Sequence, residues 1–183
     1  MKIILCTGNR GKLLEVSRIL DMPLDSASPD LDEIQGLDAL LVCRRKAAEA
    51  FALLGRPVLV DDTALHLAAL GGFPGALVTW AIESGGPELL HRMLPPGASP
   101  AASAVTVIGY ADEAGVETFA GALAGHVVAA PRGAEGFGFD PVFVPEGEER
   151  TLAEMSAAEK DSLSPRGRAL RQAAAFLRAR AGA

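Results

Sequence analysis

Residues 3–12, IILCTGNRGK, join an apolar run to a glycine-rich turn that ends in a lysine. The apolar run predicts a buried strand over 2–6, and the apolar spacing after the turn predicts a helix over 12–20. Backbone N–H groups at such a helix start attract anions, although an ordinary strand-to-helix connection has the same pattern. The stretch is not a P-loop, because only two residues separate its glycines and Leu13 follows the lysine.

Outward from this stretch, strands alternate with helices in the first half of the chain and a hairpin occupies the second half. This order predicts an α/β fold with a mixed sheet and flanking helices. No repeat or linker interrupts it, so we expect a single domain over 1–183. The expected elements after the first helix are a loop over 26–36, a helix over 38–54, a strand over 58–60, a helix over 79–94 weakened at Gly85–Pro87, strands over 103–110 and 116–128, and a final helix over 164–180 with Ser164 as N-cap and Pro165 at its first position.

Charge and composition narrow the class of protein. A net charge of −6 over 183 residues argues against binding polymeric DNA or RNA, but allows a small anionic ligand held by lysines and a metal ion. No apolar run is long enough to cross a membrane. Cys6 and Cys43 form no CxxC pair, so we expect two buried, reduced thiols in a cytoplasmic protein.

Two adjacent acids, Asp61 and Asp62, follow the apolar run at 58–60. In α/β sheets, ligands bind beyond the carboxyl ends of strands, where we expect both TGNRGK and these acids to lie. Neighbouring strand residues point to opposite faces, so only one of the two carboxylates can face a given site. Buried acids need a metal ion or cations. The alternative is a helix that begins at Asp62 or Thr63 and continues through ALHLAAL.

A second glycine-rich loop, GFGFD, places Phe137 and Phe139 on either side of a glycine. These aromatic side chains either form a small cluster of the core or offer a surface to a planar ligand. Glu33, Lys46 and Lys160 are, taken singly, ordinary surface charges. The histidines match no metal spacing and no nucleophile elbow occurs, so we expect no covalent catalyst.

The motifs form an ordered set along the chain: TGNRGK, VDDTAL, GGFPG, GFGFDPVF and EKDSLSPRGRAL. This set resembles the inosine triphosphate pyrophosphatase family over nearly the whole chain. The resemblance implies a long mixed sheet split into two lobes around a nucleotide cleft, and a homodimer. It also implies Mg²⁺-dependent hydrolysis of ITP, dITP and XTP to the nucleoside monophosphate and pyrophosphate, by attack of water on the α-phosphorus.

The resemblance assigns roles to the residues around the triphosphate. Glu33 and Asp62 would hold Mg²⁺, which prefers a few carboxylates together with phosphate oxygens and waters. Asp62 would also orient or deprotonate the attacking water. Lys12 and Lys46 would neutralise the triphosphate, with Lys12 counted as catalytic together with Asp62. The phosphate-binding positions would be Thr7, Gly8, Asn9, Arg10, Gly11 and Lys12, and Thr63 is a further substrate-binding position.

The resemblance also assigns a base pocket, in which Phe137 would stack on the purine. An arginine aimed at the base favours the 6-oxo acceptor of inosine and xanthine over the amino group of adenine. The residues of this pocket would be Phe137, Gly138, Phe139, Asp140, Lys160, Ser164 and Arg166.

One residue departs from the family pattern. Pro165 stands where the family usually has a histidine that helps to hold the base. Proline fits the start of a helix but brings no side-chain donor, so we expect weaker or differently built base selectivity. Three alternatives remain open: a Maf-like pyrophosphatase for other nucleotides, a nucleotide-binding protein without catalysis, and a plain interaction module.

Overall fold

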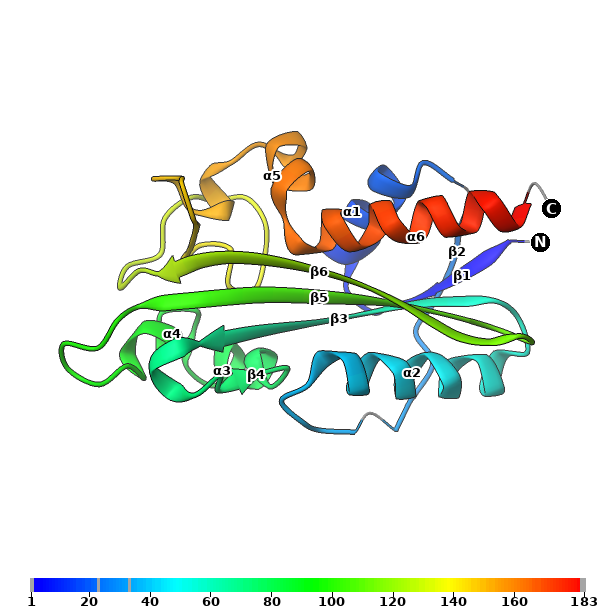
Figure 1. Cartoon of the computed structure of the whole chain (residues 1–183), viewed down its shortest axis with the longest axis horizontal. Helices are drawn as coiled ribbons and strands as arrows, with labels where there is room; N and C mark the ends of the chain where they lie inside the picture. Colours follow the sequence, from blue (N-terminus) through cyan, green and yellow to red (C-terminus); the bar gives the residue numbers. More distant parts are fainter. Residues whose placement is uncertain (1, 23, 33, 182–183) are drawn as a thin grey trace.

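The computed structural model describes residues 2–22, 24–32 and 34–181. A seven-stranded mixed sheet runs through the molecule in the order β2-β1-β3-β5-β6-β7, with β4 paired to β3 (Figure 1). The strands are β1 (Ile3–Cys6), β2 (Leu24–Ala27), β3 (Val58–Leu67), β4 (Pro74–Gly75), β5 (Ala101–Asp112), β6 (Gly115–Val127) and β7 (Phe143–Pro145). The helices are α1 (Arg10–Leu20), α2 (Ala39–Leu54), α3 (Val78–Gly85), α4 (Leu89–Arg92), α5 (Ala157–Leu163) and α6 (Pro165–Ala181), with 3-10 turns at Ala68–Leu70 and Leu152–Glu154.

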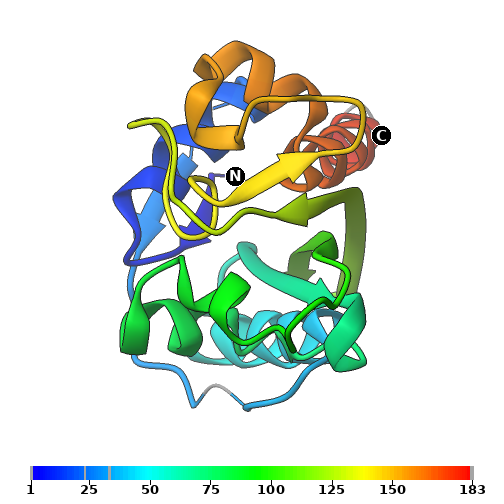
Figure 2. The same ribbon diagram turned by 90° about the vertical axis from the view of Figure 1, so that its left-hand side faces the viewer.

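Helices cover both faces of the sheet. Helix α2 lies on one face, and α1 and α6 lie on the other, as Figure 1 and the end view in Figure 2 show. The alternation along β3 matches these layers, since Val58 and Val60 pack in the cluster under α2 while Leu59 packs in the cluster with α1 and α6. Side chains of β3 at even positions therefore face α2, and those at odd positions face α6.

The sheet is parallel at one side and antiparallel elsewhere. β1 pairs in parallel with β2 and β3, whereas β3, β5, β6 and β7 form antiparallel pairs. The predicted α/β class and mixed sheet are confirmed. The expected division into two lobes around a cleft stays a prediction.

Two expected elements differ from the structure. The stretch expected to be a loop from residue 26 begins inside β2, which pairs with β1 along its whole length. β3 does not end at Val60 but continues to Leu67, because ten of its residues pair with β5. The pattern of ALHLAAL fits a helix, yet this pairing outweighs the local preference. No helix therefore begins at Asp62 or Thr63.

The final helix begins as expected. Pro165 is its first residue, and Ser164 Oγ accepts a hydrogen bond from the Gly167 backbone N–H at 3.0 Å. The weak point expected at Gly85–Pro87 is the break between α3 and α4. Helix α5, just before α6, was not expected from the sequence.

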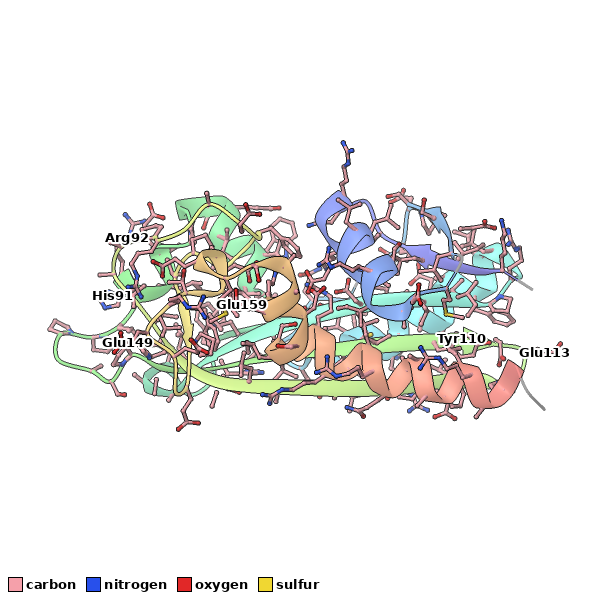
Figure 3. All side chains as sticks on the ribbon, turned by 90° about the horizontal axis from the view of Figure 1, so that it is seen from above. His91, Arg92, Tyr110, Glu113, Glu149 and Glu159 are labelled. Carbon is pink, nitrogen blue, oxygen red and sulfur yellow. The ribbon has the colours of Figure 1, made fainter. Side chains whose placement is uncertain are left out.

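The sheet has two distinct ends. Figure 3 places Tyr110 and Glu113, at the β5–β6 turn, beside the last turns of α6, and His91 and Arg92 of α4 at the opposite end. Among the described residues, no helix is long and apolar enough to cross a membrane.

Candidate nucleotide site

The site lies at a gap along one edge of β3. β1 pairs with β3 as far as Leu59, and β4 pairs with it from Leu65. Between these two pairings, the described residues give Asp61–Thr63 a neighbouring strand only on the β5 side. Two cavities of about 400 Å³ and 250 Å³ open at this gap. Because β1 runs parallel to β3, the turn after β1, TGNRGK, lies next to the two aspartates.

We call the larger hollow the polar cavity and the smaller one the aromatic cavity. The polar cavity lies between the turn after β1, the segment that joins β2 to α2, and α3. Its lining includes Thr7, Asn9, Lys12, Lys46, Asp61 and Asp62. The aromatic cavity lies towards α5 and α6. Its lining includes Glu15, Thr63, Phe137, Lys160, Pro165 and Arg166, and it shares Asn9, Lys12 and Asp62 with the polar cavity.

The turn after β1 is ordered by its own side chains. Asn9 caps α1, because its Oδ1 accepts from the Lys12 backbone N–H at 3.1 Å, and Thr7 Oγ1 accepts from the Asn9 backbone N–H at 3.1 Å. Gly11 allows the ring of Phe137 to lie against the start of α1, since a Cβ there would stand 2.8 Å from Phe137 Cδ1. The turn therefore presents Lys12 to both cavities.

Asp61 and Asp62 have separate partners, as their opposite orientations require. Asp61 faces α6, where its carboxylate lies 2.8 Å from Lys12 Nζ and 2.9 Å from Arg166 Nε. Burial alone would raise the pKa of Asp61, but the charges of Lys12 and Arg166 outweigh it and hold that pKa well below its usual range. Asp61 is thus a permanent anion that positions two cations.

Asp62 faces the α2 side, where Lys46 Nζ lies 4.0 Å from its Oδ2 and the Thr63 backbone N–H donates to its Oδ1 at 3.1 Å. Its side chain borders both cavities. A carboxylate between two lysine-lined hollows suits Mg²⁺, which binds one or two carboxylates and takes its other ligands from phosphate and water. Asp62 therefore fits as one ligand of this ion, and the described residues hold no group of three or more metal-ligating side chains. Glu33, the other predicted metal ligand, lies outside the described residues.

A buried charge cluster connects Asp61 to Asp140 of the aromatic loop. It contains three carboxylates and three cations. Beyond the contacts of Asp61, three hydrogen bonds link its members. Lys160 Nζ donates to Asp140 Oδ2 at 2.7 Å and to Glu15 Oε2 at 3.4 Å, and Arg166 Nη1 donates to Glu15 Oε2 at 3.1 Å. The cluster consists of Glu15, Asp61, Asp140, Lys12, Lys160 and Arg166.

Glu15 is a site residue that the sequence analysis missed. Its side chain is 3% exposed, and its Oε1 is buried with no hydrogen-bond partner among the described residues. Such an atom is costly unless a ligand supplies a donor. One feature of the sequence could have indicated this role. Glu15 lies one helical turn after Lys12, on the face that α1 buries with Val16.

Asp140 holds the GFGFD loop in place. Its Oδ2 accepts from the Phe137 backbone N–H at 2.7 Å as well as from Lys160. Burial raises the pKa of Asp140, and this effect exceeds the opposing effect of Lys160. Gly136 must lack a side chain, because a Cβ there would stand 2.3 Å from Asp140 Oδ2 and its φ is +78°.

The two loop phenylalanines have different environments. Phe139 is buried and packs edge-on against Phe143, with ring centroids 5.8 Å apart. Phe137 lies beside the charge cluster, with Lys160 Nζ 4.7 Å and Arg166 Cζ 5.1 Å from its ring centroid. Phe137 thus offers its ring to the cavity, whereas Phe139 chiefly belongs to the core. A contact of Phe139 with a base stays a prediction.

A model of the Ham1 family matches residues 3–176. The chain belongs to the Ham1 family. The resemblance expected from the ordered motifs is thereby confirmed.

Named relatives in this family match almost the whole chain. An inosine triphosphate pyrophosphatase of Aspergillus oryzae is 44% identical, covering 92% of this chain and 89% of its own length. A dITP/XTP pyrophosphatase of Hyperthermus butylicus is 36% identical, covering 96% and 94%. The solved structure of a Staphylococcus aureus Ham1 protein superposes with a TM-score of 0.83 at 26% identity, covering 98% of this chain and all of that one.

Most of the residues predicted for the site of this Ham1 protein line one of the two cavities. Arg10 does not, because it is exposed at the start of α1 and lines neither cavity, and Gly11 instead contacts Phe137. The predicted positions that line a cavity are Thr7, Gly8, Asn9, Lys12, Lys46, Asp62, Thr63, Phe137, Gly138, Phe139, Asp140, Lys160, Ser164 and Arg166.

Proposed function

We propose that this Ham1 protein hydrolyses ITP, dITP and XTP to the nucleoside monophosphate and pyrophosphate, using Mg²⁺ and a single domain that spans 1–183. It is a hydrolase of nucleoside triphosphates, in line with relatives named as inosine triphosphate and dITP/XTP pyrophosphatases. The observation that carries the proposal is the joining of two unlike cavities at Asp62 and Lys12. One is suited to phosphates and the other to a flat base.

The polar cavity accounts for the triphosphate and the reacting bond. Lys12 and Lys46 bring positive charge from two sides, so phosphate oxygens can replace part of their contacts with the aspartates. Asp62 lines both cavities, which supports a position beside the phosphate nearest the nucleoside. Its carboxylate orients the attacking water and accepts its proton. Bound Mg²⁺, held by Asp62, would neutralise charge on the phosphate oxygens.

The aromatic cavity accounts for selection of 6-oxo purines. Arg166 has five N–H donors and uses three in bonds to Asp61, Glu15 and Thr63, which leaves donors for the O6 acceptor of the base. Glu15 Oε1, which has no partner among the described residues, can accept the N1–H of a 6-oxo purine. Adenine presents a donor at position 6 and an acceptor at N1, so both contacts become unfavourable. Phe137 packs against the flat face of the base.

The test measures pyrophosphate and orthophosphate release with and without Mg²⁺ over ITP, XTP, dITP, GTP, ATP, UTP and dTTP. We expect Mg²⁺-dependent pyrophosphate from ITP, dITP and XTP, and a loss of about 10²–10⁴-fold in Asp62→Asn. Turnover of UTP or dTTP in place of these purines would support the Maf-like alternative. Nucleotide binding without release of pyrophosphate would support a binding protein, and orthophosphate as product would mean cleavage at another bond.

Pro165 gives a second test of base selection. It lines the aromatic cavity but has no side-chain donor, so it cannot disfavour the 2-amino group of guanine by facing that donor with a second donor. We expect Pro165→His to raise the ratio of ITP to GTP turnover. An unchanged ratio would show that this position does not set selectivity.

We also propose a homodimer, as the family resemblance implies. Leu37, Leu40 and Phe73 are exposed, and a largely apolar hollow of about 330 Å³ lies beside them over β5 and β6. Exposed apolar surface of this kind is typical of an interface. We expect sedimentation equilibrium to give a dimer that Leu40→Glu weakens, and a monomeric parent protein would refute the proposal.

A further inference from the structure

Trp80, on α3, is the single tryptophan of the chain and is 60% exposed. So much exposure is unusual for a side chain of this size, unless its N–H has a particular partner. The indole Nε1 donates a hydrogen bond of 2.8 Å to Gln35 Oε1. Both residues line the polar cavity, so the bond joins two of its walls.

Gln35 belongs to the β2–α2 segment, by which we mean residues 28–32 and 34–38. Backbone contacts hold this segment on either side of Gln35. The Asp32 N–H donates to Glu49 Oε1 of α2 at 2.7 Å, and Leu37 O accepts from the Ala76 N–H at 3.1 Å.

The contact between Leu37 O and the Ala76 N–H leaves no room for a side chain on the neighbouring Gly75. A Cβ on Gly75 would stand 2.5 Å from Leu37 O, and the φ of +59° at this residue also favours glycine. The β2–α2 segment is therefore tied to α2 at one end and to the start of α3 at the other. Within this segment, the side chain of Gln35 reaches α3 beside the polar cavity.

We propose that Trp80 is a positioning residue for the nucleotide site, whose indole N–H fixes Gln35 and with it the outer wall of the polar cavity before the nucleotide enters. The inference rests on the proposed function of this cavity. A wall that is ordered in the free protein does not have to be ordered on binding, so nucleotide affinity rises while the chemical step is unaffected. A single solvent-exposed hydrogen bond accounts for an effect of about three- to tenfold.

The experiment compares Trp80→Phe and Gln35→Leu, which remove the donor and the acceptor while keeping most of the apolar surface. We expect each to raise the KM for ITP about three- to tenfold with kcat changed less than about twofold. The double variant should be no worse than Gln35→Leu alone, because that change already removes the bond to Trp80. Leu53→Ala, on the exposed face of α2, is the control for loss of exposed apolar surface and should match the parent.

Two readouts do not depend on turnover. Affinity for the α,β-imido analogue of ITP should fall by the same factor as KM rises. Because Trp80 is the single tryptophan, its emission in the free protein should change in Gln35→Leu, where the indole loses this hydrogen-bond acceptor. Unchanged affinity and KM in Trp80→Phe, or additive effects in the double variant, would overturn the proposal.

These readouts separate the two proposals. If the parent releases no pyrophosphate but binds the analogue, the proposed reaction fails while the affinities still test Trp80. If the parent binds no nucleotide, both proposals fail. If turnover is as proposed and Trp80→Phe behaves as the parent does, only the role of Trp80 is refuted.

Discussion

The α6 face of the sheet holds two clusters of charged side chains around buried carboxylates, one at the site and one at the β5–β6 turn. At the turn, Asp112 Oδ2 accepts from Tyr110 OH at 2.9 Å and from Arg180, and its Oδ1 accepts from the Ala114 N–H at 2.9 Å. Both oxygens are therefore bonded. At the site, Glu15 Oε1 has no partner among the described residues and borders a cavity.

The difference shows how one kind of chemistry serves two purposes. A buried ionic group whose bonds are all made within the chain holds two elements together, here the β5–β6 turn and the end of α6. A cluster with one acceptor left over is less stable than it could be, but it can recognise a ligand.

The largest effect is expected for Arg166→Met. This change leaves Asp61 and Glu15 buried without their shared cation, which costs about 3–5 kcal/mol of unfolding free energy. It also removes the donor proposed for O6, so ITP turnover should fall by at least about 10²-fold. Urea unfolding and pyrophosphate release measure the two effects.

The matched control is Arg168→Met, two residues along α6, where the exposed arginine donates to Ala122 O. It should lower stability by less than about 1 kcal/mol and leave turnover unchanged. Similar losses in both variants would mean that the buried contacts of Arg166 with Asp61 and Glu15 contribute no more than the exposed contact of Arg168.

At the other cluster, Asp112→Asn should affect stability alone. The variant loses the negative charge that Arg180 contacts, and it also loses one of the two carboxylate oxygens that accept hydrogen bonds at the turn. These losses should lower the free energy of unfolding by about 1–3 kcal/mol. ITP turnover should stay within about twofold of the parent, because Asp112 lies at the end of the sheet away from both cavities of the site. A large loss of turnover in the folded variant would show that the two clusters are coupled.

Glu15→Gln changes the unpartnered oxygen with little change in volume. The amide can present a donor to the base in place of an acceptor, so discrimination between ITP and ATP should fall by about tenfold. Comparison of kcat/KM for the two nucleotides measures this. An unchanged ratio, with stability also unchanged, would remove Glu15 from the proposed contact with N1–H.

The contrast also shows what the sequence could predict. Period-two alternation placed Asp61 and Asp62 on opposite faces, which the pairing of β3 and the two lysine contacts bear out. Motif order indicated the family, and Ser164 and Pro165 indicated the start of α6. These features depend on local geometry or on strings of residues.

What the sequence could not predict depends on contacts between distant segments. Glu15 resembles any solvated helix acid until Lys160 and Arg166, about 150 positions later, are packed against it. Phe137 and Phe139 are equivalent in the sequence, and only the position of Phe143 makes one of them core. The extension of β3 likewise depends on β5, because strand propensity is set by pairing as much as by composition.

The smallest effect is the titration of Tyr110, the single tyrosine of the chain. Burial, followed by the hydrogen bond and charge of Asp112, raises the pKa of Tyr110 to about 12. A tyrosine in the unfolded chain titrates near its ordinary pKa of about 10, so Tyr110 contributes stability that is complete below about pH 10 and is lost as the pH rises towards 12.

The absorbance of the phenolate should therefore appear near pH 12 in the folded parent and near pH 10 in urea. In Asp112→Asn the midpoint should fall by about one pH unit, because the neighbouring negative charge is gone while burial remains. Equal midpoints for the folded parent and the variant would mean that burial alone raises the pKa, and that the closed cluster at the turn is held by Arg180 and not by the phenol.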